Sequence, residues 1–169
     1  KTIIALWDGG TTLLHKYIDD IMDLCEQGCR VFVVDLTGTG TVSDGLYNAG
    51  QPDFYYTRMV AFCENLLVNG DSLPAMRVRG ICKAVDAAEN FAGEDAEIGI
   101  VSYGLFSLYA LMAGLIDNRI KFVDERNTPK SIKALAEKKY YNHNNIMAAV
   151  LPGMLREFDL DDLRSFFNN

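Results

Sequence analysis

The chain has 169 residues, the length of one ordinary domain. Apolar residues make up 49% of it and charged residues 23%, which is typical of a folded globular protein and not of a disordered segment. Sixteen Lys and Arg against 23 Asp and Glu give a formal net charge of −7, so we expect neither a nucleic acid nor an anionic membrane surface as a partner. The apolar runs are shorter than the ~20 residues that span a bilayer, so no membrane-spanning helix is expected.

Strand and helix patterns alternate from the N-terminus. The apolar run Thr2–Leu6 predicts a strand. After a glycine turn, a helix is expected to begin at Thr11 or Thr12 and to end at Gly28. Its apolar residues recur at spacings of three and four and define a buried face, made of Leu14, Ile18, Ile21, Met22 and Cys25. Val31–Val34 is apolar at every position, which is typical of a parallel strand buried on both faces.

Two amphipathic helices are expected before the third strand. The first runs from Asp53 to Gly70. The second is preceded by Ser72, which can cap it, and ends at Gly93.

The third strand is predicted at Ile98–Val101 and is followed by a sharp turn at residues 102–104. A helix of small and apolar residues then extends to Ile116, and Ile120–Val123 reads as a last strand. Four strands separated by helices predict an α/β fold: a three-layer αβα arrangement around a mostly parallel sheet.

The chain is expected to form a single domain over residues 1–169. Its strand-helix core is predicted at about residues 1–124, and about residues 125–169 are expected to be helical or irregular, with Asp159 capping a terminal helix. Four parallel strands leave sheet edges or an apolar face without cover, which predicts self-association or a partner segment.

The cysteines and histidines predict neither a cofactor nor a metal. Four cysteines lack paired spacing and are expected to be reduced, mostly buried thiols, which slightly favours a cytoplasmic protein; they are Cys25, Cys29, Cys63 and Cys82. The two histidines, His15 and His143, have no second ligand at zinc-binding spacing. Asp8 and Asp35 each end a strand and could together bind a metal or a sugar hydroxyl, although cap or turn hydrogen bonds are the more common role of such residues.

A buried strand, a tight turn and a small-residue helix together have the pattern of a nucleophile elbow. The segment from Glu97 to Ser107, with the later Asp117-Asn118-Arg119, resembles the α/β-hydrolase superfamily and in particular its acetyl-xylan-esterase-like branch of carbohydrate esterases. Gapless comparison with that pattern places Gly104, flanked by Tyr103 and Leu105, where the nucleophilic Ser belongs. A glycine has no side chain and cannot be a nucleophile.

The resemblance continues on both sides of the elbow. Asp8, with Gly9 and Gly10, takes the place of the family's oxyanion loop, where an acidic side chain opposes a developing oxyanion. The strand-end turn with Asp35, Gly38 and Gly40 also matches, with Thr37 in place of an Arg. The resemblance therefore implies a partial, degenerate hydrolase fold that lacks the later strands bearing the acid and the His. Because the chain begins at Lys1 inside a strand-like run, we expect a processed or truncated polypeptide that has lost any N-terminal signal.

Three functions follow from these observations. The first is a non-catalytic hydrolase-like domain that packs against a companion hydrolase domain or chain, or holds a carbohydrate or a small acyl ligand. The second is an active esterase or deacetylase on acetylated carbohydrate, with Ser102 as nucleophile and His143 as base. The third is a small nucleotide-binding module using the turn Gly38–Gly40, which fits no established phosphate-loop pattern.

Overall fold

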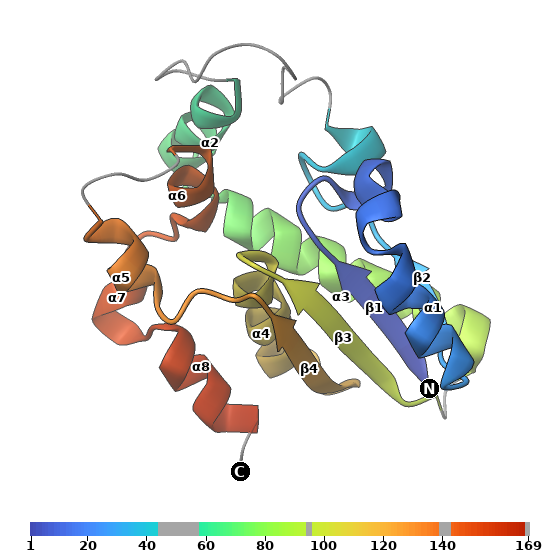
Figure 1. The fold of residues 1–169 in the computed structure, drawn as a ribbon. Coiled ribbons are helices and arrows are strands. Elements are labelled where there is room, and N and C mark those ends of the chain that lie inside the picture. Colours follow the sequence, from blue (N-terminus) through green and yellow to red (C-terminus); the bar gives the residue numbers. More distant parts are fainter. Residues whose placement is uncertain (44–57, 94–95, 139–142, 168–169) are drawn as a thin grey trace.

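The computed structural model describes residues 1–43, 58–93, 96–138 and 143–167. Its sheet has four parallel strands in the order β2-β1-β3-β4 (Figure 1). The strands are β1 (Thr2–Leu6), β2 (Arg30–Val33), β3 (Ile98–Tyr103) and β4 (Ile120–Arg126). All four expected strands are confirmed, and β3 and β4 continue beyond their expected ends. The expected burial of β2 on both faces is wrong, because β2 lies at the edge of the sheet and its residues are only partly buried or exposed.

Helices connect the strands and make up the C-terminal part. The described helices are η1 (Gly10–Lys16), α1 (Ile18–Glu26), η2 (Gly40–Val42), α2 (Arg58–Val68), α3 (Leu73–Ala92), α4 (Phe106–Ile116), α5 (Ile132–Ala136), α6 (His143–Ala149), α7 (Met154–Glu157) and α8 (Leu160–Phe167). The expected helix start at Asp53 lies outside the described residues. None of the described helices combines the length and apolarity needed to cross a bilayer.

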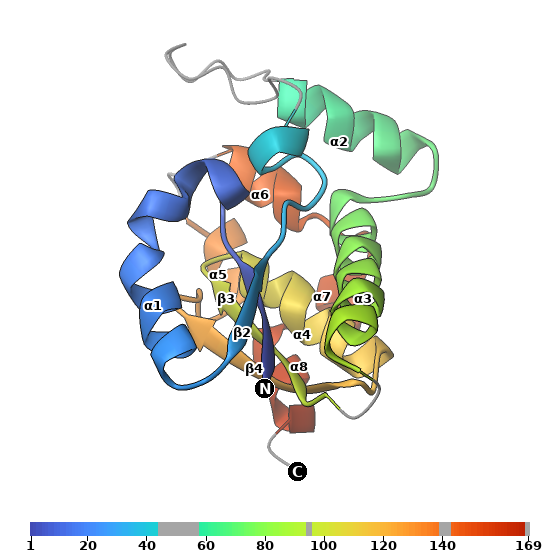
Figure 2. The ribbon, with the colours of Figure 1, turned by 90° about the vertical axis from the view of Figure 1, so that its right-hand side faces the viewer.

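The helices cover the two faces of the sheet unequally and give the expected three layers. Figure 2 shows α1 on one face and α3 with α4 on the other. This distribution follows from the right-handedness of parallel crossovers: the chain moves from β1 to β2 in one direction and from β2 through β3 to β4 in the opposite one. The main core lies between the sheet and the α3–α4 layer, with Ile4, Ile100 and Ile81 among its fully buried members.

A second, smaller core lies beyond the carboxyl ends of the strands. There α2 packs against α6 (Figure 1), and Met59, Cys63, Leu73 and Ala148 are buried together. Leu105, at the start of α4, is partly buried and contacts both cores. Helices α2 and α6 therefore lie beyond the carboxyl ends of the strands.

Hydrogen bonds at helix ends agree with the expected caps. Ser72 precedes α3, and its hydroxyl accepts a hydrogen bond from the Ala75 N–H at 3.3 Å. The carboxylate of Asp159 accepts from the N–H of Leu160, the first residue of α8, at 2.7 Å. It also accepts from the N–H groups of Ile132 and Lys133 at 2.7 and 3.1 Å, so one aspartate joins the beginnings of α5 and α8.

The buried face expected for the first helix is wrong in its phase. Leu14, Ile18 and Met22 are 36%, 41% and 53% exposed, and no residue of α1 is fully buried. The segment begins as a 3-10 helix that is interrupted at Leu13 and joins α1 at Tyr17, so its early residues turn by more per residue than those of an α-helix. Within α1 itself, Ile18, Met22 and Cys25 still share one side, and that side is exposed, whereas Ile21 and Leu24 are partly buried.

The thiols also differ from the expectation of burial. All four described cysteines are free, but only Cys63 is buried, and Cys25 is exposed on α1. Cys25 belongs to the side of α1 that is expected to be buried but is exposed, and Cys29 and Cys82 are only partly buried.

Self-association remains a prediction, and the exposed apolar side chains of Leu14, Ile18 and Met22 are candidate contacts for it. We expect the molar mass measured by light scattering to rise with protein concentration, and the double variant Ile18→Gln/Met22→Gln to shift it toward the monomer mass. Val68→Gln on α2, where Val68 is 87% exposed, serves as the control and should change nothing. A monomer mass at every concentration would contradict the prediction.

Candidate functional site

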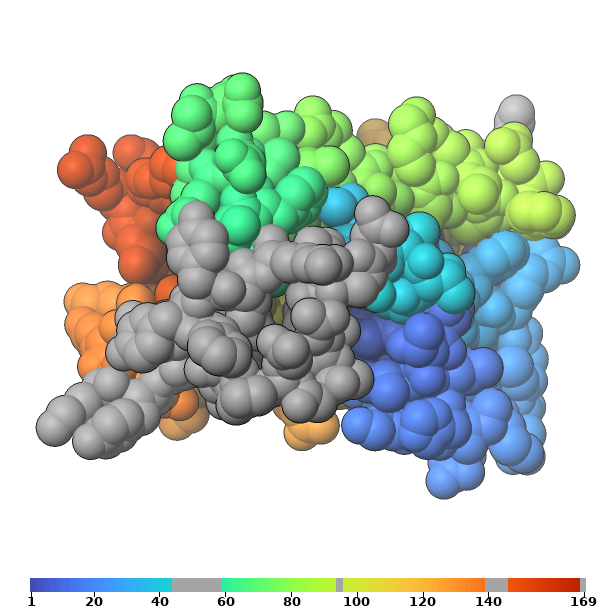
Figure 3. Space-filling view, turned by 90° about the horizontal axis from the view of Figure 1, so that it is seen from above, coloured from blue at the N-terminus to red at the C-terminus, as the bar shows by residue number. Residues whose placement is uncertain are grey.

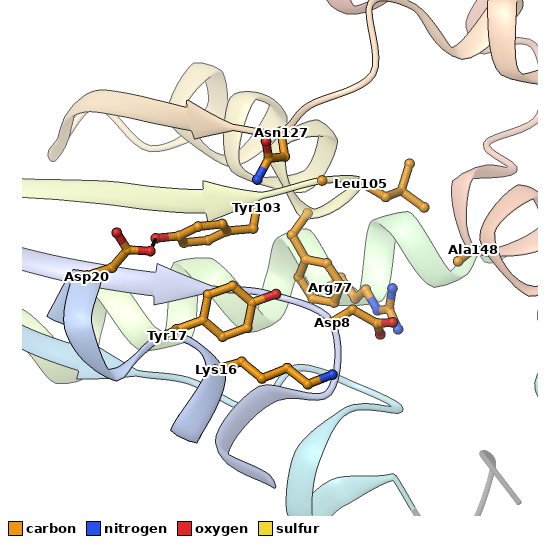
Figure 4. A pocket seen from close by; sticks show the side chains of 11 residues that line it. Asp8, Lys16, Tyr17, Asp20, Arg77, Tyr103, Leu105, Asn127 and Ala148 are labelled. Carbon is orange, nitrogen blue, oxygen red and sulfur yellow. Dashed lines mark hydrogen bonds between the residues drawn. The ribbon is translucent and has the colours of Figure 1, made fainter. Parts of the chain in front are cut away.

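A pocket lies where the order of the strands reverses. The chain leaves β1 toward β2 on one side and reaches β3 on the other, and open α/β sheets bind ligands at the carboxyl ends of strands at such a switch point. The pocket there has a volume of about 450 Å³ (Figure 4). Its lining residues are Asp8, Lys16, Tyr17, Asp20, Arg77, Tyr103, Gly104, Leu105, Phe106, Asn127 and Ala148.

The turn between β3 and α4 forms one wall of this pocket. Gly104 has φ +60°, in the left-handed region that glycine adopts without strain, and its N–H donates to the carbonyl of Arg126 at 2.8 Å. A Cβ added at Gly104 would meet no atom within 4 Å. The three residues expected at the elbow, Tyr103, Gly104 and Leu105, therefore all line the pocket, and the position expected for the nucleophile faces open space.

Ser102 points away from the pocket. It is fully buried, and its hydroxyl lies 3.0 Å from the hydroxyl of Ser107 and 3.5 Å from the carbonyl oxygen of Asp124. The Ser107 hydroxyl is in turn 2.7 Å from that of Thr128. Ser102 thus joins β3 to α4 and β4 inside the core. His143 begins α6, and its side chain lies outside the described residues.

The turn after β1 supplies the opposite wall. Asp8 is exposed and lines the pocket, whereas Gly9 and Gly10 do not. The glycines instead let the chain turn tightly, because a Cβ on Gly9 would collide with Leu13. The indole N–H of Trp7 donates to the Gly10 carbonyl at 2.7 Å and fixes the turn.

Asp35 does not share a site with Asp8. Its carboxylate accepts hydrogen bonds from the N–H and hydroxyl of Thr11, both at 2.6 Å, and from those of Thr41, both at 2.9 Å. These contacts tie η1 to η2, which lie against each other in Figure 3. A Cβ on Gly10 or Gly40 would collide with this carboxylate, which explains both glycines. Among the described residues, no group of three or more acidic, His or Cys side chains could hold a metal ion.

The turn Gly38–Gly40 has no open cradle for a phosphate. The N–H of Thr41 is bound by the Asp35 carboxylate, and the N–H and hydroxyl of Thr39 both donate to the carbonyl of Leu36. An anion of the protein itself thus occupies the position that a phosphate would need, and η2 has only three residues. Neither Gly38 nor Gly40 lines the pocket.

Aromatic rings form a third wall. Tyr17 stacks on Trp7 with ring centroids 4.4 Å apart, and the ring of Tyr103 meets Tyr17 edge-on at 4.7 Å. Figure 4 shows Tyr17 and Tyr103 projecting into the pocket from η1–α1 and from the end of β3. The contacts hold Trp7, which is buried, directly behind the pocket wall.

A charged network fixes Tyr103. Its hydroxyl donates to the carboxylate of Asp20 at 2.5 Å and accepts from the Arg126 guanidinium at 2.9 Å, and Arg126 pairs with Asp20 at 3.0 Å. Burial and the hydrogen bond to Asp20 raise the pKa of Tyr103 to about 12, against the opposing effect of Arg126. Tyr103 therefore remains a protonated donor, and Asp20 is already neutralised by Arg126.

The sequence did not single out several of the residues that line the pocket, and Arg77 is the most deeply buried of the charged ones; the others are Lys16, Tyr17, Asp20, Phe106, Asn127 and Ala148. Arg77 lies on α3 and is 1% exposed, although arginine is rarely buried without a partner. One sequence signal existed, because Arg77 falls at the helical spacing of Pro74, Ile81 and Val85, all on one side of α3. Its partners, Thr37 and Tyr109, are distant in the sequence and could not be inferred from spacing.

No protein-family model matches this chain, and no curated protein or solved structure matches it. The functional interpretation of the pocket therefore depends on its own geometry and chemistry.

We predict that Asp35→Asn lowers the free energy of unfolding by about 2 kcal/mol, because the amide presents a donor to groups that are themselves donors. Burial alone would raise the pKa of Asp35, but its four hydrogen bonds outweigh this effect and lower it. The ionised carboxylate thus contributes stability above the ordinary carboxyl pKa, and this contribution is lost as the pH falls through the lowered value. Denaturant unfolding at several pH values measures both effects. Asp23→Asn, on the exposed side of α1, is the control, and equal losses in the two variants would contradict the prediction.

A second prediction concerns Tyr103. In an ultraviolet titration of the folded protein, Tyr103→Phe should remove one phenol that ionises at a pH of about 12 and leave the other tyrosines unchanged. Circular dichroism at each pH confirms that the chain is still folded. If the variant lost a phenol titrating near the ordinary tyrosine pKa, the network of Asp20, Tyr103 and Arg126 would not exist in solution.

Proposed function

We propose that this chain is a non-catalytic, degenerate member of the α/β-hydrolase superfamily, related to acetyl-xylan-esterase-like proteins, that holds a ligand in its switch-point pocket. The observation that carries the proposal is Gly104. It occupies a strand-to-helix turn with the geometry of a nucleophile elbow, faces the pocket, and has no side chain with which to attack a substrate.

The surroundings of Gly104 support a binding role over hydrolysis. Asp8 lies at the position expected for the oxyanion loop, and a carboxylate there would destabilise the negative charge of a tetrahedral intermediate. The pocket is nevertheless retained, with aromatic and charged side chains around a volume of about 450 Å³. A carbohydrate or a small acyl compound is compatible with such a lining.

The active-esterase alternative has less support. A Ser nucleophile must reach its substrate and a base, and Ser102 is buried with its hydroxyl directed at Ser107. The nucleotide alternative is disfavoured in the same way, because Asp35 occupies the backbone donors that a phosphate would use. Self-association, or packing against a companion hydrolase chain, remains part of the proposal and is compatible with ligand holding.

The hydrolysis of a chromogenic acetyl ester tests the proposal. We expect the wild-type chain, Ser102→Ala and Ser107→Ala to show the same rate as buffer, because neither serine lines the pocket. Ser107→Ala is the matched control, since it removes the other member of the buried hydroxyl pair. Turnover by the wild-type chain that Ser102→Ala abolishes and Ser107→Ala preserves would falsify the proposal.

A further inference from the structure

The guanidinium of Arg77 is held rigidly between three segments of the chain. Its Nε donates to the carbonyl of Thr37 at 3.1 Å, and its Nη1 donates to the Tyr109 hydroxyl at 2.9 Å. Tyr109 donates onward to the carbonyl of Ala148 at 2.8 Å. The guanidinium also lies over aromatic rings, with its carbon 4.9 Å from the ring centroid of Phe106 and 5.1 Å from that of Tyr109.

One nitrogen of this group has no partner. Nη2 of Arg77 is buried and makes no hydrogen bond, and Arg77 forms no ion pair within the described part of the chain. A buried charge without a counter-ion is destabilising, and native proteins rarely leave a buried donor unused. Because Arg77 lines the switch-point pocket, an anion bound there would supply the missing acceptor.

The charges around the pocket favour a single negative charge on that anion. Lys16 adds a second cation, whereas Asp8 adds an anion that would repel a ligand. Asp20 also lines the pocket but is paired with Arg126. With Asp20 paired, Arg77 and Lys16 (+2) and Asp8 (−1) leave a net charge of +1 around the pocket, which a monoanion balances and a phosphate monoester dianion exceeds, so a monoanion is preferred.

The other residues that line the pocket are compatible with a ligand whose uncharged part is apolar or aromatic. Leu105, Phe106 and Ala148 contribute apolar surface to the lining, and Tyr17 and Tyr103 contribute aromatic rings. Figure 4 shows Leu105 and Ala148 toward one end of the pocket and Tyr17 and Tyr103 toward the other. The eleven-residue helix α4 begins at Phe106 without a side-chain cap, so its first N–H groups add a favourable dipole for an anion. We therefore propose that the ligand is a small organic monocarboxylate whose carboxylate binds Nη2 of Arg77 and whose apolar part packs on the aromatic wall. This inference depends on the proposed ligand-holding function and specifies its ligand class.

The single tryptophan provides a direct readout of binding. Trp7 stacks on Tyr17, which lines the pocket, so a ligand that displaces the Tyr17 ring will alter the Trp7 fluorescence. The titration uses hexanoate and benzoate, their neutral amides hexanamide and benzamide, and phenyl phosphate as the dianion. Calorimetry repeats each titration independently of fluorescence.

We expect each carboxylate to bind at least about tenfold more tightly than its amide, because a charge-assisted hydrogen bond to a guanidinium is lost in the amide. Phenyl phosphate should bind more weakly than benzoate. Arg77→Met should abolish the preference for the acid over the amide, and Arg77→Lys should recover only part of it.

Variants at two exposed positions, Asp8 and Lys16, test the same inference even if the Arg77 variants do not fold. Asp8→Asn removes the repelling carboxylate and should tighten carboxylate binding on the order of two- to fivefold, while Lys16→Gln should weaken it by a similar factor. Asp23→Asn and Lys121→Gln, which change the same charges at exposed positions away from the pocket, should leave the affinity unchanged.

The outcomes separate this inference from the function on which it depends. Equal affinity for acids and amides, tighter binding of phenyl phosphate than of benzoate, or no effect of Asp8→Asn and Lys16→Gln would overturn the carboxylate assignment. Saturable binding of a neutral acetylated sugar without carboxylate binding would overturn it and leave ligand holding intact. Ester turnover that depends on Ser102 would instead overturn the non-catalytic function.

Discussion

The reversal of strand order between β1 and β3 is the constraint on which the site depends. Because every crossover between parallel strands is right-handed, a change of direction across the sheet sends the connecting helices to opposite faces. α1 therefore leaves on one face and α3 with α4 on the other, so the carboxyl ends of β1 and β3 are adjacent without a helix between them. Asp8 and Gly104, which are far apart in the sequence, meet around the resulting pocket. The positions of both follow from topology before any side-chain contact is considered.

Asp35 and Arg77 are two charged side chains near this edge. They differ in how completely the protein supplies partners for their hydrogen-bonding atoms. Asp35 is held by four hydrogen bonds from Thr11 and Thr41, and its charge is fully used in joining η1 to η2. Arg77 is more deeply buried, yet it uses only two of its nitrogens for protein acceptors. A buried charge whose hydrogen bonds are complete supports the fold, whereas one with an unused donor beside a pocket indicates a binding role. This difference distinguishes the strand-end turn at Asp35 from the ligand site at Arg77.

The sequence predicts elements that are determined locally. Short, mostly apolar runs identified the four parallel strands, and Ser72 identified the start of α3, because both signals depend on adjacent residues. Only β1 and β3, in the middle of the sheet, are buried along nearly their whole length. The buried side of α1 was mispredicted, because α-helical spacing predicts which residues share a side of the helix and not which side faces the sheet. At the site, Gly104 and Asp8 were identified by their position after a strand. Arg77 was missed, because its burial is set by Thr37 and Tyr109, which only the folded chain brings to it.

The turn between β3 and α4 has a structural role that does not require a nucleophile. A serine at φ +60° would carry a backbone cost of about 1–2 kcal/mol, which glycine avoids. Gly104 therefore relieves strain while its N–H keeps the bond to the Arg126 carbonyl, and Arg126 in turn orients Tyr103. The residues of this turn and of the charged network, Gly104, Tyr103 and Asp20, all line the pocket. On the proposed function, the open space at Gly104 gives a bound anion room in the pocket that Arg77 also lines.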